Sequence, residues 1–348
     1  MVAAICKELE LRQTFTPERF ETVYFGGGTP SLLDVSQLEQ ILNRISQTIP
    51  ITLDAEVTLE TNPEDITEEK LNSWQALGIN RLSIGIQTFN DQKLSFLNRK
   101  HTGREAQSAV LQAKAAGFSN ISCDLIYAIP PYDLGHWEED LNTVLRLEVP
   151  HISLYSLTIE EKTVFGNWKN KGLFQEVSEN DNASSYETAV HLLKEDGFRH
   201  YEVSNFCKPG SISVHNSNYW SNKDYLGIGP GAHSFDGKKR YFNVSNNAKY
   251  MAAMSNGSTF YDFEELSESQ HLNEYLLTGL RTSKGISLRY LLKKFNVDLL
   301  EKYGAFIDQL LVANLAKREG DRLSLSSKGM ANADEITLKF FQDDQRLK

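Results

Sequence analysis

The 348-residue sequence is poor in cysteine, with only Cys6, Cys123 and Cys207, which lie far apart along the chain. Small domains held together by disulfides have an even number of closely placed cysteines, so this class of fold is excluded. An odd number of isolated cysteines is typical of a reducing compartment. We therefore expect a cytoplasmic protein.

Long apolar runs and an excess of positive charge are also missing. No stretch approaches the ~20 apolar residues of a membrane-spanning helix, and the first residues, MVAAICKELELR, lack the apolar core of a signal peptide. Lys and Arg number 36 against 46 Asp and Glu, which gives a net charge of -10. Because a protein that neutralises phosphates needs a basic face, we expect no nucleic-acid partner and no membrane span.

Two common phosphate-binding motifs are absent as well. No Gly-Lys-Ser/Thr follows Gly28, which excludes a P-loop. Gly227, Gly229 and Gly231 do not have the spacing of the dinucleotide-binding fingerprint, and Pro230 stands where that motif opens a helix. The sequence therefore does not indicate a P-loop nucleotidase or a Rossmann dehydrogenase.

The most informative stretch is Val23 to Ser31, which reads VYFGGGTPS. Val23, Tyr24 and Phe25 are typical of a buried strand, and three glycines follow them directly. Glycine has no Cβ and adopts positive φ at little cost, so such a turn can bring backbone N–H groups close to a polar or anionic ligand. An ordinary strand-to-helix turn explains three glycines equally well.

Strand-like and helix-like runs alternate over the first part of the chain. The predicted helices are Met1–Leu11, Asp34–Thr48, Thr67–Leu77, Asp91–Leu97, Arg104–Ala116 and His136–Leu147. The predicted strands are Val23–Phe25, Leu53–Leu59, Arg81–Gln87, Ser122–Tyr127 and His151–Leu157. This alternation predicts a parallel sheet with crossover helices, either barrel-like or doubly wound, whose ligand binds at the carboxyl ends of the strands.

Polar residues stand at those strand ends, namely Gly26 to Thr29, Glu60, Gln87, Asp124 and Ser156. Each of them alone is explained by a helix cap or a turn. Together, a glycine turn and side chains on successive strands predict a polar pocket. Two carboxylates in it would suit a ligand that carries hydroxyls and an ammonium group.

Beyond Thr158 the alternation loosens, with a helix predicted at Asn182–Asp196 and a strand at Arg199–Ser204. The last part is mostly helical, with elements predicted at Ser267–Thr282, Leu288–Phe295, Asp298–Leu315, a strand at Asp321–Ser326 and a final helix to about Gln342. Helices followed by a small β wing indicate a winged-helix module, which suits a lid or a partner surface better than DNA binding, because a groove binder has a clustered basic face. We expect two domains, residues 1–260 and 261–348.

Eight motifs in order resemble those of one family. They are YFGGGTPSLL, LETNPEDI, GINRLSIGIQTFND, FLNRKHT, CDLIYAIP, SLYSLTIEEKTVF, HNSNYW and YLGIGPGAHSF. The chain resembles the oxygen-independent coproporphyrinogen III oxidase-like branch of the radical S-adenosylmethionine (SAM) enzymes, and most closely the HemW-type haem chaperones. The resemblance implies an α/β fold, a partial (β/α)6 barrel of the TIM type with a small C-terminal helical, winged-helix-like domain.

The resemblance also implies ligands for single residues. Gly26, Gly27, Gly28 and Thr29 of the glycine turn, with Glu60 of LETNP, match residues that bind the methionine moiety of SAM. These five residues are the first cofactor-binding candidates.

Further candidates follow from the same resemblance. Gln87, Arg99 and Asp124 match residues that line the same pocket or a second nucleotide site, where a buried carboxylate such as Asp124 suits a ribose. Ser156 and His233 are additional cofactor-binding candidates.

The segment HNSNYW, which begins at His215, resembles an HNxxYW segment that is linked to haem binding in this family. The resemblance makes His215 a candidate axial ligand to haem iron, a role that imidazole commonly fills. Without the resemblance, a structural histidine is the simpler interpretation.

The family further implies a 4Fe–4S cluster, held by a CxxxCxxC loop after the first barrel strand. This sequence has no such loop, and Cys6, Cys123 and Cys207 are too far apart to replace it. We therefore expect no cluster on this chain unless the loop is restored. The uncapped first helix indicates that Met1 is an internal methionine, so that the first barrel strand and the cluster loop are missing.

Three functions are open at this point. The first is a haem-binding chaperone on a radical SAM scaffold, which transfers haem to an unidentified acceptor protein and binds SAM. The second is oxidative decarboxylation of coproporphyrinogen III in haem biosynthesis, which requires the missing cluster. The third is an inactive relic. HNSNYW favours the chaperone, and no catalytic residue is assigned.

Overall fold

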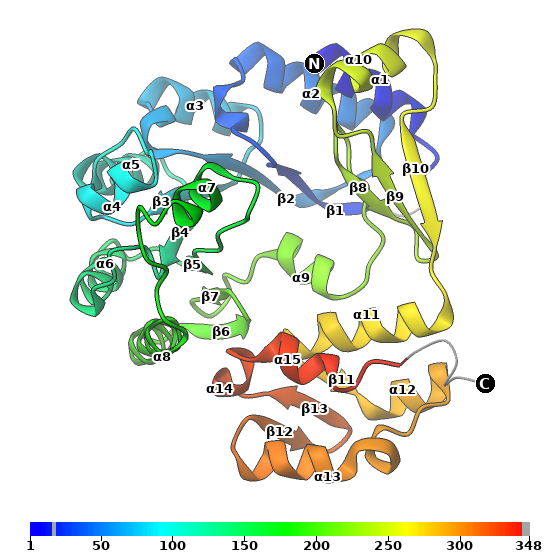
Figure 1. The fold of residues 1–348 in the computed structure, drawn as a ribbon. Helices are drawn as coiled ribbons and strands as arrows, with labels where there is room; N and C mark the ends of the chain where they lie inside the picture. Colours follow the sequence, from blue (N-terminus) through cyan, green and yellow to red (C-terminus); the bar gives the residue numbers. More distant parts are fainter. Residues whose placement is uncertain (16–18, 343–348) are drawn as a thin grey trace. The chain divides into compact units, whose positions relative to one another are not determined.

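A computed structural model describes residues 1–15 and 19–342 of the chain (Figure 1). The chain divides into two compact units. The barrel unit comprises Phe25–Leu32 and Val57–Ile212, and the composite unit comprises Met1–Tyr24, Leu33–Glu56 and Ser213–Lys348. Within the described ranges, no helix is both long enough and apolar enough to cross a membrane.

Seven strands of the described chain form the main sheet, in the order β1-β2-β3-β4-β5-β7-β6. They are β1 (Phe20–Phe25), β2 (Ile51–Thr61), β3 (Arg81–Gln87), β4 (Asn120–Tyr127), β5 (His151–Ser156), β6 (Arg199–Glu202) and β7 (Asn205–Cys207). Neighbours from β2 to β5 are parallel, whereas β7 is antiparallel to both β5 and β6. The partial α/β barrel predicted above is confirmed.

Helical segments connect the parallel strands. In the barrel unit they are η1 (Pro30–Leu32), η2 (Pro63–Asp65), α3 (Glu68–Ala76), α4 (Asp91–Phe96), α5 (Gly103–Ala115), α6 (Leu134–Arg146), α7 (Val164–Asn170) and α8 (Glu179–Glu195). The side chains of Thr67, Asn90, Thr102 and Asp133 accept hydrogen bonds from first-turn N–H groups of α3, α4, α5 and α6. These caps determine where the four helices begin.

The two faces of the parallel strands differ in polarity because successive side chains of a strand point to opposite faces. One face is apolar and buried, and it includes Leu82, Ile84, Ile121 and Leu125. Helix α5 packs on β3 on this side of the sheet, and each apolar side chain removed from water contributes roughly 1.5–3 kcal/mol to folding. The other face carries the polar residues from which the candidate site is built.

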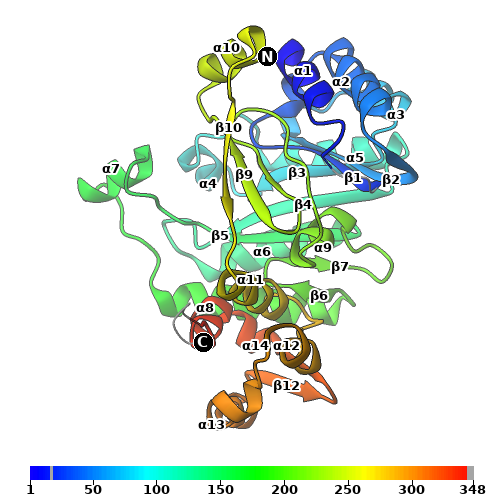
Figure 2. The same ribbon diagram turned by 90° about the vertical axis from the view of Figure 1, so that its right-hand side faces the viewer.

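The composite unit joins segments that are distant in sequence. It contains α1 (Val2–Leu11), α2 (Val35–Thr48), α9 (Val214–Trp220), α10 (Asn247–Asn256) and the strands β8 (His233–Phe235), β9 (Lys239–Asn243) and β10 (Tyr261–Glu265), which form a sheet in the order β10-β9-β8. Helix α1 contacts both α2 and α10, as Figures 1 and 2 show. Ala4 of α1 packs with Tyr250, Ala253, Met254 and Phe260 in one buried cluster.

The C-terminal part of the composite unit has helices around a small sheet. Its elements are α11 (Glu268–Leu280), β11 (Ile286–Ser287), α12 (Leu288–Phe295), α13 (Leu299–Val312), β12 (Ala316–Glu319), β13 (Arg322–Leu325), α14 (Ser327–Met330) and α15 (Ala333–Leu338). Strand β13 pairs antiparallel with both β11 and β12. The predicted helices and β wing are thereby confirmed.

Two sequence predictions need correction. The single final helix predicted to reach Gln342 is wrong: the chain forms α14 and α15, which are separated at Asn332, a residue with non-helical φ of -121° and ψ of 28°. The residues between Asn205 and Glu265 received no helix or strand prediction, yet they form β7, α9, β8, β9, α10 and β10. Short elements among many glycines and turns leave too few residues for a periodic pattern.

Candidate functional site

The glycine turn that follows β1 is exposed and is anchored in the barrel unit at its far end. The Ser31 hydroxyl is fully buried and donates to Asp65 Oδ2 at 2.7 Å, while Lys70 Nζ donates to the Ser31 carbonyl at 3.0 Å. Gly27 has a φ of +81°, and apart from the glycine and its two chain neighbours no atom of the described chain lies within 4 Å of the Cβ position at Gly27 or Gly28. The turn is therefore held in place while its backbone stays accessible to a ligand.

Asp124 is held by hydroxyl groups from its own strand, β4, and from a neighbouring strand. Ser83 of β3 donates to Asp124 Oδ2 at 2.8 Å, and Ser122 of β4 donates to Oδ1 at 3.1 Å. Burial raises the pKa of the Asp124 carboxyl, and hydrogen bonds from Ser153 and Ser83 oppose that rise. The register places Glu60 opposite Ser83 and Asp124 opposite Ser153, so two carboxylates share this polar face.

The negative charges of these carboxylates affect one tyrosine on β5, Tyr155. Burial raises the pKa of the Tyr155 phenol, and the negative charges of Asp124, Glu202 and Glu60 raise it further. Glu60 and Asp124 therefore both act on the Tyr155 phenol.

Arg99 contacts a residue that was not predicted, Asn62, and the side chains of both Gln87 and Asn62 lie beside Gly85. Gln87 ends β3 with a φ of 69°. A Cβ atom added at Gly85 would lie 2.7 Å from Gln87 Nε2 and 3.5 Å from Asn62 Oδ1. Arg99 Nη1 donates to Asn62 Oδ1 at 3.2 Å. Asn62 stands two residues after Glu60 in LETNP. Its position at the end of a strand was the only feature of the sequence that could have indicated it as a site residue.

Ser156 ends β5, and its hydroxyl forms hydrogen bonds with neighbouring residues of the barrel unit. Asn182 of α8 donates to Ser156 Oγ at 2.7 Å, and the Tyr127 hydroxyl also forms a hydrogen bond with Ser156. These contacts are sufficient to explain Ser156 as a residue that ties α8 to the end of the sheet.

His215 lies in the composite unit, in the first turn of α9. Its Nδ1 atom is 3.0 Å from Thr22 Oγ1, and its ring stacks on Tyr24 with centroids 4.5 Å apart. Glu56 Oε1 accepts from the His215 backbone N–H at 2.9 Å and from the Ser213 hydroxyl at 3.3 Å. Residues of β1 and β2 thus fix the orientation of the imidazole, and Glu56 is a positioning residue that the sequence did not reveal.

His233, also in the composite unit, begins β8 with an exposed side chain. The glycine-rich segment before His233 packs tightly against its neighbours. A Cβ at Gly227 would lie 2.0 Å from the His233 carbonyl oxygen. The Gly229 N–H donates to Glu8 Oε2 at 2.8 Å. Gly227 is therefore required by close backbone approach, which explains the segment without a nucleotide fingerprint.

The three cysteines do not fit an iron–sulfur cluster. All are free and buried, and burial raises the pKa of each thiol, that of Cys207 to about 11. Cluster ligands are thiolates on closely spaced cysteines. In the ranges that the structure describes, no group of three or more His, Cys, Asp or Glu side chains is suited to a metal.

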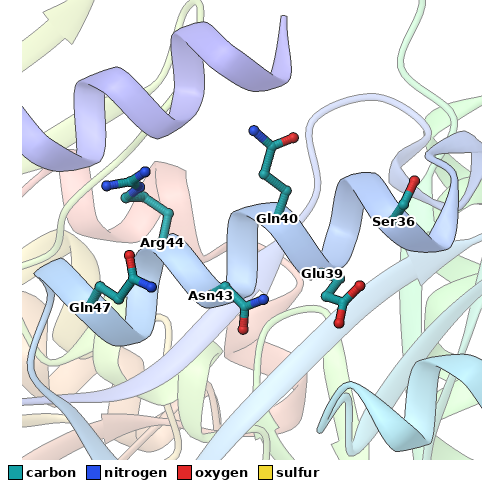
Figure 3. Close-up of a pocket in the computed structure, with 6 residues that line it drawn as sticks. All are labelled: Ser36, Glu39, Gln40, Asn43, Arg44 and Gln47. Carbon is teal, nitrogen blue, oxygen red and sulfur yellow. The ribbon is translucent and has the colours of Figure 1, made fainter.

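Figure 3 shows a shallow hollow along α2 that is separate from these residues. Its lining consists of Ser36, Glu39, Gln40, Asn43, Arg44 and Gln47. All six belong to one helix, and Gln40 and Arg44 extend to the opposite side from Glu39 and Asn43. An open surface of this kind does not enclose a ligand, and it contains none of the predicted site residues.

Comparisons with known proteins cover both units. Two family models match, the radical SAM superfamily over residues 8–144 and the HemN C-terminal domain over residues 266–331. The heme chaperone HemW of Lactococcus lactis is 36% identical over 97% of this chain and 88% of its own length. The heme chaperone HemW of Bacillus subtilis is 33% identical over 91% of this chain and 84% of its own length.

Among solved structures, coproporphyrinogen III oxidase (HemN) from Escherichia coli is similar, with a TM-score of 0.83 over 98% of this chain and 82% of that chain. The identity is 18%, so this likeness shows the fold alone.

Proposed function

Because the chain belongs to the HemW-like family of radical SAM proteins, we propose that it binds haem and transfers it to an acceptor protein. The observation that carries this proposal is the environment of His215. Thr22 and Tyr24 hold its ring, and Glu56 holds its backbone. A side chain with a fixed orientation is suited to bind a metal in a defined geometry.

In the proposed haem complex the two ring nitrogens of His215 have different partners. When the Thr22 hydroxyl accepts from Nδ1–H, the lone pair is on Nε2, which is the atom that would bind haem iron. Haem is then the cargo of the protein.

We further propose that the barrel unit binds SAM. The exposed glycine turn, which Thr29 follows, is suited to the carboxylate and ammonium groups of the methionine moiety, and we propose Glu60 as a further ligand of that moiety. Asp124, Gln87 and Arg99 supply the acceptors and donors that a nucleoside requires. Ser156 is proposed as a further contact only because it matches the family, whereas His233, which belongs to the composite unit, stays a prediction from the sequence.

The acceptor of the haem is a protein that remains to be identified. Three free cysteines without a disulfide fit a reducing compartment, so we propose that the transfer takes place in the cytoplasm.

Haem titration of the purified 348-residue chain tests the main proposal. We expect a Soret band that saturates with haem, and a dissociation constant that rises at least about tenfold in His215→Ala, because loss of one ligand bond costs more than 1.4 kcal/mol. His191→Ala, at an exposed side chain of α8, is the matched control and should bind like the wild type. Unchanged affinity in His215→Ala would remove His215 from the site, and a wild type without a Soret band would refute haem binding.

Calorimetric titration with SAM tests the barrel unit. Asp124→Asn should weaken binding about tenfold, because an amide cannot replace a carboxylate that accepts from ligand hydroxyls. The control is Asp334→Asn, at an exposed residue of α15 that pairs with Arg281. Equal effects of the two substitutions would contradict a role for Asp124.

Oxidative decarboxylation of coproporphyrinogen III is the alternative function. That reaction requires an iron–sulfur cluster, and the three buried, widely separated cysteines of this chain do not fit one. Anaerobic reconstitution with iron and sulfide should give this chain no cluster absorption beyond that of a variant with all three cysteines replaced by serine.

A further inference from the structure

A chain of buried hydrogen bonds leads from Asp124 to the antiparallel end of the sheet. Ser122 Oγ, which donates to Asp124 Oδ1, is also 2.8 Å from His151 Nδ1. His151 Nε2 is in turn 2.8 Å from the hydroxyl of Tyr201 on β6. All four residues belong to the barrel unit, and the three beyond Asp124 are buried.

The donors along this chain have one consistent direction when Asp124 is ionised. A carboxylate only accepts, so Ser122 donates to it and must accept from Nδ1–H of His151. Neutral imidazole carries a single N–H, so Nε2 accepts from the Tyr201 hydroxyl. Burial holds the pKa of His151 well below its usual range, which is consistent with a neutral ring.

The direction of the chain has a consequence for the carboxylate. Ser83 donates to Oδ2 and Ser122 to Oδ1, so both oxygens are fixed by protein donors. Linked hydrogen bonds in a low-dielectric interior strengthen one another. The Tyr201 hydroxyl therefore strengthens the hydrogen bond of His151 to Ser122, and through it the hydrogen bond that Ser122 donates to the Asp124 carboxylate. Without these donors, burial would favour the protonated acid, which is a poorer acceptor for a ligand hydroxyl.

We propose that His151 and Tyr201 are positioning residues for Asp124: through Ser122 they orient its carboxyl oxygens toward a ligand that presents hydroxyl donors, such as a ribose, and they favour its ionised form. This inference rests on the proposed SAM site. Neither residue needs to touch the ligand, since both act through the hydrogen bonds of Ser122.

Tyr201→Phe is the first test, because it removes one hydroxyl and keeps the ring. We expect the SAM dissociation constant to rise about three- to tenfold, the loss of roughly one hydrogen bond, with a folded protein by thermal melting. Tyr186→Phe is the matched control: Tyr186 is also buried in the barrel unit and its hydroxyl also meets a histidine, His200, at 3.2 Å. Tyr186→Phe should change SAM affinity less than twofold.

Two further variants distinguish positioning from a structural role. His151→Asn retains an amide donor near the position of Nδ1 but loses Nε2 and with it the link to Tyr201, so it should bind SAM about as Tyr201→Phe does. His151→Leu removes both contacts and should bind more weakly than either. In the double variant Asp124→Asn/Tyr201→Phe, affinity should equal that of Asp124→Asn alone, because Tyr201 acts only through the carboxylate.

The outcomes separate the two proposals. A wild type that does not bind SAM refutes the proposed SAM site and this inference with it. A wild type that binds, with Tyr201→Phe indistinguishable from it or with additive effects in the double variant, refutes the inference alone.

Discussion

Tyr24 and His215 stack with their ring centroids 4.5 Å apart and their planes 21° from parallel. Tyr24 directly precedes the last residue of β1, and His215 is in the first turn of α9, so the stack joins segments far apart in sequence. The contact fixes the plane of the imidazole, while Thr22 fixes its rotation. Haem binding at His215 should therefore depend on both residues.

Tyr24→Ala is expected to weaken haem binding about two- to tenfold, because an aromatic stack of this kind is worth roughly 0.5–1.5 kcal/mol. Tyr24→Phe should retain the affinity, since the ring remains. Tyr290→Ala, at a half-exposed residue of α12, serves as the control. The measurement is the haem titration followed by the Soret band, and equal affinity of Tyr24→Ala and wild type would show that Thr22 alone orients the ring.

Gly85→Ala should reduce SAM affinity at little expense of stability. The new Cβ would lie 2.7 Å from Gln87 Nε2, which is the far end of a flexible side chain, so the Gln87 side chain must move while the backbone stays. We expect at least a threefold weaker affinity, or about 0.7 kcal/mol, in calorimetric titration.

The control for that substitution is Gly304→Ala. Gly304 lies in α13, and apart from its chain neighbours and the backbone of its own helix no atom of the described chain is within 4 Å of its Cβ position. Alanine there should stabilise the protein by up to about 1 kcal/mol and leave SAM affinity unchanged. A loss of affinity in both variants would disprove the explanation through Gln87.

Tyr250→Phe should destabilise the composite unit. The Tyr250 hydroxyl donates to Glu8 Oε2 at 2.6 Å, and both side chains are fully buried, so no water replaces the lost donor. A hydrogen bond to a charged group is worth about 1.5–3 kcal/mol, and we expect that loss in urea unfolding at neutral pH. Tyr290→Phe should unfold like the wild type.

The same variant has a pH dependence with a defined sign. Burial raises the pKa of Glu8, so the folded protein favours the protonated acid and loses stability as pH rises through the raised pKa. The lost donor matters most when Glu8 is ionised. The difference between wild type and Tyr250→Phe should therefore shrink toward acid pH, and a difference that grows there would contradict this account.

His200 should make the protein sensitive to acid. Burial lowers the pKa of His200 to about 4, and its ring stacks on Phe206 at 4.2 Å. Above the unfolded pKa of about 6.5 both states are neutral and the stability is full; between about 6.5 and 4 only the unfolded chain binds the proton, which costs roughly 3 kcal/mol in total.

His200→Gln removes this titration. The stability advantage of the wild type over His200→Gln should therefore decrease by about 2–3 kcal/mol between pH 7 and pH 4 in urea unfolding. His191→Gln, at an exposed position, should follow the wild type at every pH. A constant difference between wild type and His200→Gln would show that folding does not change the pKa of His200.

Regular periodicity made the parallel strands and their helices predictable. Arg81–Gln87 was predicted with the bounds of β3, because its apolar residues alternate with Ser83 and Gly85 between clear helix signals. A shared location for polar side chains was also predictable from their positions at strand ends, since parallel strands place their carboxyl ends at one edge of the sheet. The assignment of Gly26 to Thr29, Glu60, Gln87, Arg99, Asp124, Ser156, His215 and His233 to ligands stays a prediction, as does the domain boundary at residue 260.

Contacts between distant segments could not be predicted. Glu56 stands in the middle of a strand and gives no local sign that it accepts from the first turn of α9. Likewise, HNSNYW has too few residues for a helical period, and it forms α9 because Ser213 and Glu56 accept its first N–H groups. Such hydrogen bonds depend on tertiary structure, and no spacing in one segment encodes them.

Gly28 shows how a substitution can separate folding from recognition. It lacks the positive φ of Gly27, and no neighbour in the described chain would meet a methyl group there, so alanine at position 28 should leave expression and melting temperature as they are. A variant library sorted for protein abundance would score this residue as neutral. The proposed SAM site predicts that the same library sorted for SAM binding rejects alanine at position 28, and the contrast would identify a glycine that the ligand itself requires.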